Sequence, residues 1–406
     1  MDDGSRMPTP LTRRQLNRAT LERQLLLRRE TLDVVEAVRR ITAIQAQEPA
    51  SPYIALWNRL DPFDPADLDR AFDRHDIVKG SMMRITLHAV AAEDHPAFHH
   101  AMQPGLRAAR YMDRRFTSEG VPVADVEALI PDLRSFLREP RTSKDIEGWV
   151  EQRLGAAKPR VWWALRHVGP FIHGVTGGPW SFGPRPSYKG SPHPTRPGDP
   201  QESVPILVRR YLEAFGPATL PDIAQFGTGY RPPVRQALEA MDGELQRYEG
   251  PEGVTLYDVM EGPMPDEDVP APPRLMAMWD SSLLAYADRS RVVPSEYRTL
   301  VMRSNGDVLA TVLVDGYVAG VWRPSEHGIE VTAFHSLGTE AWTALEDEAQ
   351  RLVAFLADRD PNVYRRYQHW WDGLPAAETR VLGGEGRRRS TTSRSRPRRR
   401  WPPSSR

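Results

Sequence analysis

The chain has 406 residues, a hydrophobic fraction of 40% and no cysteine, so it has room for two to four small domains with cores of their own. The lack of cysteine excludes disulfides, thiolate zinc sites, iron–sulfur clusters and cysteine nucleophiles. The formal net charge of zero hides nine arginines and no acid in residues 387–406, which leaves 45 basic and 54 acidic residues, a net charge of −9, in the rest. A generally basic surface for nucleic acid is therefore excluded for the body, and such binding would need local patches.

Nothing in the sequence indicates export or a membrane anchor. The acidic first residues are not followed by an apolar stretch, so they do not have the pattern of a secretory signal. No uninterrupted apolar run approaches the length that crosses a bilayer. We therefore expect a cytoplasmic protein without a membrane span.

The first predicted unit covers residues 10–105 and begins with a helix. Thr12 stands three residues before Gln15, and an apolar residue follows, which is the pattern of a capping box at a helix start. The further elements expected here are several helices up to about residue 47, a short helix near 66–74 and strands near 77–91.

Similar capping patterns open two more predicted units, at Thr142 with Asp145 and at Thr219 with Asp222. In the second unit, residues 106–190, we expect helices near 143–153 and 160–168, then a hairpin of Phe171–Val175 and Trp180–Phe182. In the third unit, residues 200–260, we expect helices near 219–226 and 231–241, then strands at 245–248 and 254–257. Helix, turn, helix and hairpin is the order of a winged-helix domain.

A β-rich segment is predicted for residues 274–360. Val308–Val314 and Tyr317–Trp322 flank Asp315-Gly316, which is a strong signal for a tight hairpin, and a helix near 340–357 closes the segment. The predicted fold class is therefore α+β, with three tandem winged-helix units followed by a β-rich C-terminal segment.

Three stretches are expected to lie outside the packed units. Residues 184–200 contain six prolines, and residues 261–273 are acidic and proline-rich, so both are expected to be loops or linkers. Residues 383–406 are rich in Gly, Ser, Pro and Arg and are expected to form a disordered basic tail.

Gln45 and Gln47 stand at the end of a predicted helical stretch, directly before Glu48 and Pro49. On the residues alone, the simpler interpretation is that the two side chains cap the helix end or face solvent. A short motif of this kind is a hypothesis about chemistry only when its context supports it.

Further candidate residues fall on the predicted strands. Arg84, Thr86 and His88 alternate along one strand face and can contact a phosphate backbone, or else form local pairs on a solvated strand. The second hairpin carries His173 and Trp180, which can enter a minor groove as a wing, or else pack on the preceding helix.

The loop after this hairpin supplies the last candidates for backbone contacts, which are Arg185, Tyr188 and Lys189. His95, His99 and His100 lack a helical ligand spacing with an acidic partner, so we expect a surface helix and no metal. No Walker-type or dinucleotide-binding glycine loop is present, so no cofactor is expected.

Several motifs occur in the order found in one known family. They are Gln45-Ala46-Gln47, Pro52-Tyr53 with Leu56-Trp57, Arg84-x-Thr86-Leu87-His88, Tyr211-Leu212-x-x-Phe215-Gly216-Pro217-Ala218-Thr219, Trp279-Asp280 with Leu283-Leu284, Asp288-Arg289-Ser290-Arg291 and Tyr297-Arg298. In these residues the chain resembles the AlkZ-like winged-helix DNA glycosylases, a family founded on an enzyme of azinomycin self-resistance. The resemblance covers roughly residues 10–357. Another branch of that family has Asp at the second motif position, so Gln47 places this chain nearer the branch associated with self-resistance and crosslink removal.

The resemblance implies that Gln45 and Gln47 position the water that attacks the anomeric carbon of an alkylated purine nucleotide. It implies a monofunctional glycosylase of DNA repair, acting as a monomer on double-stranded DNA that carries alkylated bases, in the cytoplasm at the nucleoid. The alternatives that remain open are a non-catalytic winged-helix regulator and a protein that sequesters a DNA-damaging natural product.

Overall fold

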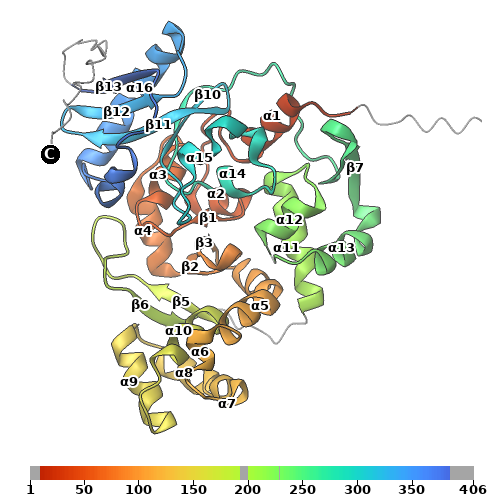
Figure 1. Cartoon of the computed structure of the whole chain (residues 1–406), viewed down its shortest axis with the longest axis vertical. Helices are drawn as coiled ribbons and strands as arrows, with labels where there is room; N and C mark the ends of the chain where they lie inside the picture. Colours follow the sequence, from red (N-terminus) through yellow and green to blue (C-terminus); the bar gives the residue numbers. More distant parts are fainter. Residues whose placement is uncertain (1–9, 193–199, 228, 385–406) are drawn as a thin grey trace, which may run out of the picture.

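The structure, a computed structural model, describes residues 10–192, 200–227 and 229–384 (Figure 1). Helix α1, Arg13–Arg23, begins at the predicted capping box, in which Thr12 and Gln15 each accept a hydrogen bond from the other's backbone N–H. The other elements of the first unit are α2 Val34–Arg40, β1 Ile44–Gln45, α3 Ser51–Trp57, α4 Pro65–Arg74, β2 Ile77–Ser81 and β3 Leu87–Ala91. The three strands form an antiparallel sheet in the order β1-β3-β2.

The glutamine segment is a strand, so the predicted helix end was wrong. Helix α2 ends before Thr42, whose backbone is left-handed with φ 70° and turns the chain away from the helix axis. Ile44 and Gln45 then pair with Ala89 and His88 of β3. Because the partner strand lies far along the chain, no local pattern in the sequence indicates this pairing.

The second unit contains the predicted helices and a short leading strand. Helix α9, Ser143–Leu154, begins at the predicted cap on Thr142, and α10, Pro159–Val168, follows it. The elements before them are α5 His95–Tyr111, α6 Arg114–Thr117, α7 Val123–Ala128, α8 Ile130–Phe136 and β4 Arg141–Thr142.

The hairpin of this unit differs from the prediction. Strand β5, Phe171–Gly174, pairs with β6, Ser187–Gly190, whereas the predicted partner Trp180–Phe182 lies in the connection between them. Tyr188 and Lys189 are therefore strand residues and not part of a linker. The sheet order is β4-β6-β5.

The third unit has the predicted two helices and hairpin. Its elements are α11 Pro200–Phe215, α12 Leu220–Phe226, α13 Arg231–Ala240, β7 Leu245–Glu249 and β8 Thr255–Val259. Helix α12 begins at the predicted capping box of Thr219 and Asp222. The predicted linker 261–273 contains no helix or strand, while residues 193–199 of the other linker lie outside the described residues.

The C-terminal segment is a five-stranded antiparallel sheet covered by a helix. Its strands are β9 Arg274–Leu275, β10 Thr311–Val314, β11 Tyr317–Ser325, β12 Gly328–Ala333 and β13 Glu378–Leu382, in the order β13-β12-β11-β10-β9. The predicted hairpin at Asp315 and Gly316 is confirmed, with φ values of 49° and 82°. Helix α16, Thr339–Ala357, is also confirmed. The predicted end at residue 360 was wrong, because β13 completes the same sheet; of the basic tail, residues 385–406 lie outside the described residues.

One strand arrangement recurs in all three units. A short leading strand pairs with the last strand of the hairpin: Gln45 opposite His88, Thr142 opposite Ser187, and the isolated bridge of Ala218 with Tyr257. Two helices lie between the leading strand and the hairpin each time.

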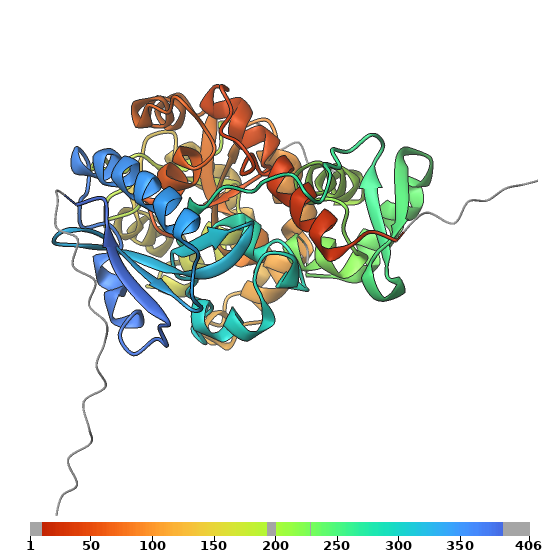
Figure 2. The ribbon, with the colours of Figure 1, turned by 90° about the horizontal axis from the view of Figure 1, so that it is seen from above.

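The first unit lies at the centre of the molecule. The second unit extends below it in Figure 1, and in both views the third unit and the C-terminal sheet lie at opposite ends (Figure 2). Helix α1 bridges these two ends, because Asn17 donates to the carbonyls of Arg291 and Gly316 while Arg23 forms a buried ion pair with Asp258. Among the described residues, no helix is both long and apolar enough to cross a membrane.

Candidate active site

Gln45 is held inside the protein by the neighbouring strand and turn. Its residue is only 3% exposed, and it lies opposite His88, which is fully buried. The Nη2 atom of Arg84 donates to Gln45 Oε1 at 3.0 Å and approaches His88 Nε2 at 3.4 Å. The structure therefore brings together three residues that the sequence singled out separately.

Arg84 reaches Gln45 from a strained turn and not from a strand face, so the predicted alternation with Thr86 and His88 was wrong. The turn η1, Met83–Ile85, has left-handed φ values of 54° at Arg84 and 59° at Ile85. Such values are rare for any residue with a side chain and rarer for a β-branched one, and they tend to occur where function requires them. Thr86 closes the turn by donating to the carbonyl of Met83, so its hydroxyl serves a local bond.

Burial sets the charge state of this group. It lowers the pKa of Arg84 to about 10, with a further contribution from the positive charge of Arg289. Burial, followed by the charge of Arg84, lowers the pKa of His88 well below its usual value. His88 is therefore a neutral imidazole, which donates from Nδ1 to the Thr86 carbonyl at 3.2 Å and accepts at Nε2.

Gln47 is the exposed member of the pair. The ladder continues beyond Gln45, because the backbone N–H of Ala46 donates to the Leu87 carbonyl at 2.7 Å. Gln47 follows two residues after Gln45, in a bend between β1 and α3. Gln47 is solvent-exposed, so one amide is fixed from the interior and the other is free to meet a ligand.

Glu48 was missed as a site residue, although it follows the motif directly. Its carboxylate forms an ion pair of 2.8 Å with Arg366 and accepts from the hydroxyl of Tyr367, both in η6, Arg365–Trp370. Burial raises the pKa of Glu48, and the charge of Arg366 opposes that shift. These contacts tie the glutamine segment to the C-terminal part of the chain, which no local sequence signal could have indicated.

Lys79 is a buried lysine in the same sheet. It lies on β2 opposite Ala89, which in turn lies opposite Ile44 of the glutamine strand. Its residue is 4% exposed, and its ammonium lies 4.3 Å from the ring centre of Phe182. Burial lowers the pKa of Lys79 to about 8.

The aromatic candidates of the second hairpin are packing residues in this structure. Trp180 is 5% exposed, lies 5.1 Å from the ring of Tyr53 and donates from Nε1 to Asp360 at 3.2 Å. Tyr188 is buried edge-on against Trp162, and His173 packs on the other side of Tyr188 at 4.8 Å. Trp180 thus packs on the first unit and the C-terminal segment and not on the preceding helix, whereas Tyr188, which was expected to contact the DNA backbone, packs on Trp162 of that helix.

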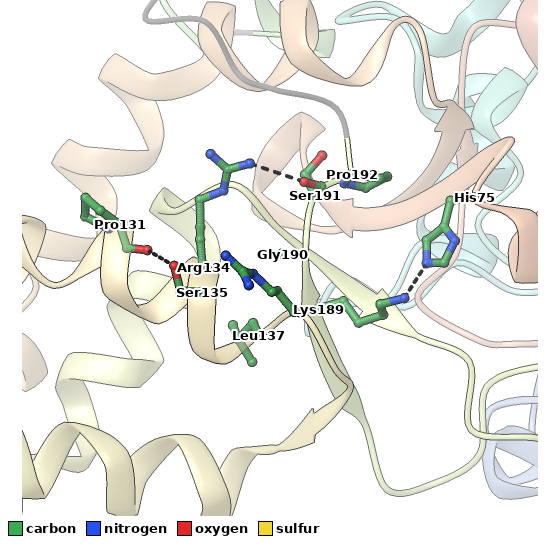
Figure 3. Close-up of a pocket in the computed structure, with 10 residues that line it drawn as sticks. His75, Pro131, Arg134, Ser135, Leu137, Lys189, Gly190, Ser191 and Pro192 are labelled. Carbon is green, nitrogen blue, oxygen red and sulfur yellow. Dashed lines mark hydrogen bonds between the residues drawn. The ribbon is translucent and has the colours of Figure 1, made fainter.

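Lys189 and its surroundings form a basic pocket of about 550 Å³ (Figure 3). The Lys189 ammonium lies 3.2 Å from His75 Nε2, and Arg134 donates to the Ser191 carbonyl at 3.4 Å. Arg138 also lines the pocket, and no acid does among the described residues. Arg185 lies outside it, exposed on the connection between β5 and β6.

The histidines of α5 do not form the surface face that was expected. His95 and His99 are 1% and 5% exposed, and His99 contacts the Gly169 carbonyl at 3.1 Å. Within residues 10–192, 200–227 and 229–384, no group of three or more His, Asp or Glu side chains could hold a metal ion.

Comparisons with known proteins agree on one family. The family described as DNA glycosylase AlkZ-like matches residues 38–355. An interstrand DNA cross-link repair glycosylase from Streptomyces sahachiroi is 25% identical over 361 residues, which are 84% of this chain and 95% of that protein. The solved structure of the Streptomyces sahachiroi DNA glycosylase AlkZ has a TM-score of 0.73 at 22% identity and covers 87% of this chain and 99% of that one, so the two share a mixed helix and sheet fold.

Proposed function

The chain belongs to the AlkZ-like family of DNA glycosylases, as its motifs indicated, and from this premise we propose that it hydrolyses the N-glycosidic bond of alkylated purines in DNA. The single observation that carries the proposal is the Gln45-x-Gln47 pair, with Gln45 at the end of β1 and fixed by Arg84. We further propose that the three repeated units are winged-helix units, with boundaries near 10–105, 106–190 and 200–260, which present this strand to double-stranded DNA.

The chemistry matches what two amides can supply. A purine alkylated at N7 or N3 carries a positive charge and leaves readily, so no strong general acid is needed. The barrier then lies in forming an oxocarbenium-like sugar, by analogy with other glycoside hydrolyses. Gln45 and Gln47 orient the attacking water, and their oxygens stabilise the developing positive charge. Normal purines leave too poorly for this machinery, so selectivity follows from the leaving group.

No amine is assigned a role, so the proposed reaction stops at an intact abasic site, without strand cleavage. The chain has four lysines, and the one in the glutamine sheet, Lys79, is buried over an aromatic ring. A lyase reaction commonly needs an accessible amine that forms a Schiff base with the sugar. We propose no metal and no cofactor.

The substrate range follows from the relative. Its name states interstrand DNA cross-link repair, and we propose that bulky natural-product adducts or crosslinks are also substrates here, in base excision repair or antibiotic self-resistance. Lys189 in its basic pocket and the exposed Arg185 are proposed backbone contacts. The buried positions of Trp180 and Tyr188, and the contact of the half-buried His173 with Tyr188, favour packing roles for these side chains. We propose a monomer acting in the cytoplasm at the nucleoid.

The decisive experiment is incubation with duplex DNA carrying one N7-methylguanine. Abasic sites are read as strand breaks after alkali, with wild type, Gln47→Ala and Gln350→Ala as a matched change of another exposed glutamine. We expect release by wild type and Gln350→Ala, and strongly reduced release by Gln47→Ala. Tight binding without any base release by wild type would instead support a non-catalytic winged-helix DNA-binding regulator.

A further inference from the structure

Two arginines from distant parts of the chain have no acidic partner among the described residues, and one of them, Arg84, donates to Gln45. Arg84 comes from the turn η1 of the first unit, and Arg289 opens η4, Arg289–Arg291, in the C-terminal segment. Neither forms an ion pair with an Asp or Glu of the described chain, whereas the buried Arg23 and Arg59 pair with Asp258 and Asp280. Both arginines lie near helix α12, because the Arg84 guanidinium is 5.7 Å from the ring centre of Phe226 and Asp222 accepts from the backbone N–H of Ala287, two residues before Arg289. The charge of Arg289 also contributes to the lowered pKa of Arg84, so the two guanidinium groups interact unfavourably in this state.

The hydrogen-bond inventory of the two side chains is incomplete. Arg84 uses Nη2 for Gln45 and His88, but its Nη1 is buried without a partner. Arg289 Nη1 meets only the sulfur of Met302, at 2.8 Å, and its Nε is buried without a partner. Among the described residues, Arg84 Nη1 is the only terminal guanidinium nitrogen in this condition; the other unpartnered arginine nitrogens are Nε atoms. A buried charged donor without an acceptor is costly, and such a group in a native structure calls for an explanation.

An anion would satisfy both side chains. Arginine nitrogens in a fixed fork match the oxygens of a phosphate, and a single phosphate between two arginines would cancel their repulsion. On DNA, the anion available at such a point is a backbone phosphodiester.

We propose that Arg84 and Arg289 together bind one backbone phosphate next to the damaged nucleotide, and that this contact holds Gln45 in its reactive orientation. The proposal rests on the glycosylase function proposed above. Arg84 is in this scheme a positioning residue, because one nitrogen binds the phosphate while the other fixes Gln45 Oε1. The C-terminal segment thereby supplies a group to the site of the first unit.

The electrostatics of the reaction give an independent reason for the phosphate. The transition state develops positive charge on the sugar, and an unpaired arginine hydrogen-bonded to Gln45 would oppose it. Once a phosphate is bound, the net charge beside the glutamine is reduced. The arginines would then oppose the oxocarbenium least on DNA that is seated correctly.

A binding experiment tests the phosphate site without relying on catalysis. The substrates are a series of duplexes that contain a tetrahydrofuran abasic analogue. In each duplex, one phosphate near the lesion is replaced by a neutral methylphosphonate, and the Kd of wild type and of Arg289→Gln is measured for every duplex. At one phosphate, the neutral linkage should weaken DNA binding by wild type about tenfold, since a hydrogen bond between charged groups contributes roughly this factor to affinity. The same linkage should weaken binding by Arg289→Gln by no more than about twofold. The salt slope should fall by about 0.9 in Arg289→Gln.

The control is Arg380→Gln, which removes one exposed charge from the outer strand β13. It should leave the methylphosphonate pattern unchanged. If Arg289→Gln and every neutral linkage act independently, no phosphate is bound by Arg289 and the proposal is overturned. Arg289 is only partly buried, so this variant is expected to fold even where changes at Arg84 do not.

The positioning role has its own measurement. With enzyme in excess, Arg84→Gln should slow single-turnover base release about tenfold or more even when all DNA is bound. Arg84→Lys should restore the affinity for DNA but not the rate of base release. In the Gln45→Ala background, Arg84→Gln should cost little more, because the side chain it positions is gone. Fully multiplicative effects would overturn the positioning role. If wild type releases no base from any lesion, the proposed function fails together with this role, while the methylphosphonate comparison still decides the phosphate site.

Discussion

The contrast between Gln45 and Gln47 leads to a prediction that separates folding from catalysis. Both Gln45→Ala and Gln47→Ala should slow base release by about a hundredfold or more, since each removes a preorganised polar contact to the transition state. Only Gln45→Ala should also reduce the free energy of unfolding, because Gln45 is 3% exposed and bonded to Arg84, whereas Gln47 is exposed. Affinity for DNA with the tetrahydrofuran analogue should change little in either variant.

The expected loss in the free energy of unfolding follows from the contacts that remain after each substitution. Without Gln45 Oε1, the Arg84 Nη2 atom keeps only its longer contact of 3.4 Å with His88. A buried charged donor without its acceptor costs about 1–3 kcal/mol, and the small cavity adds to this loss. An exposed glutamine changed to alanine stays within about 0.5 kcal/mol.

The assay combines urea unfolding with single-turnover kinetics on N7-methylguanine duplexes. Gln45→Met is the matched variant, because it nearly keeps the volume and removes only the acceptor, so it isolates the lost hydrogen bond. An unfolding midpoint of Gln45→Met equal to wild type would refute the bond to Arg84 as a stabilising contact. Near-normal release by the Gln45→Ala, Gln47→Ala double variant would remove the pair from the mechanism.

Five further outcomes are expected. Borohydride treatment during turnover should trap no protein–DNA adduct, although burial lowers the pKa of Lys79 to about 8; an adduct that disappears in Lys79→Met would show a lyase. Trp180→Ala should lower the free energy of unfolding by about 3–5 kcal/mol, because the residue is buried. Shortening the exposed loop at 176–179 should slow the release of bulky adducts more than the release of methylated bases. Equal losses of rate on both substrates would argue against a wedge. Burial lowers the pKa of His99 to about 4 from 6.5, so stability that is present above pH 6.5 should be lost as pH falls towards 4, by about 1.4 kcal/mol per unit, and His99→Gln should remove that share of the slope in urea titrations. Deleting residues 387–406, which hold nine arginines, should reduce the salt slope of DNA binding by roughly three to six without changing base release from bound DNA; an unchanged slope would show that these residues take no part.

Local signals in the sequence were sufficient for most helices and for two hairpins, β7 with β8 and β10 with β11. The three capping boxes begin helices where they were expected, because Thr12, Thr142 and Thr219 bond to groups only three residues away. Asp315 and Gly316 form their tight turn for the same reason, since both central residues must adopt positive φ there. Such features depend only on residues that are close in the chain, so they can be predicted without knowledge of the fold.

Long-range pairing accounts for what could not be predicted. Strand β6 pairs with β5 across a connection that carries its own glycine turn, so the nearer apolar run at Trp180 was the natural but wrong partner. The buried ion pair of Arg59 with Asp280, at 2.8 Å and 2.9 Å, joins residues 221 positions apart, and nothing local marks either as a partner. The bond between Arg84 and Gln45 is of the same kind, which is why the sequence could name both residues without placing them together.

The repeated strand arrangement distinguishes the first unit, in which we propose the catalytic glutamines, from the other two. In the second and third units a helix begins directly after the leading segment, and the side chains of Thr142 and Thr219 cap the N-termini of α9 and α12. In the first unit the leading strand is followed by Ala46, Gln47 and a turn before α3, and that helix has no side-chain cap. Gln45 and Gln47 therefore do not cap a helix, whereas Thr142 and Thr219 do. The proposed catalytic pair thus lies on the one leading segment of the three that does not cap a helix, and the C-terminal segment reaches that segment through the ion pair of Glu48 with Arg366.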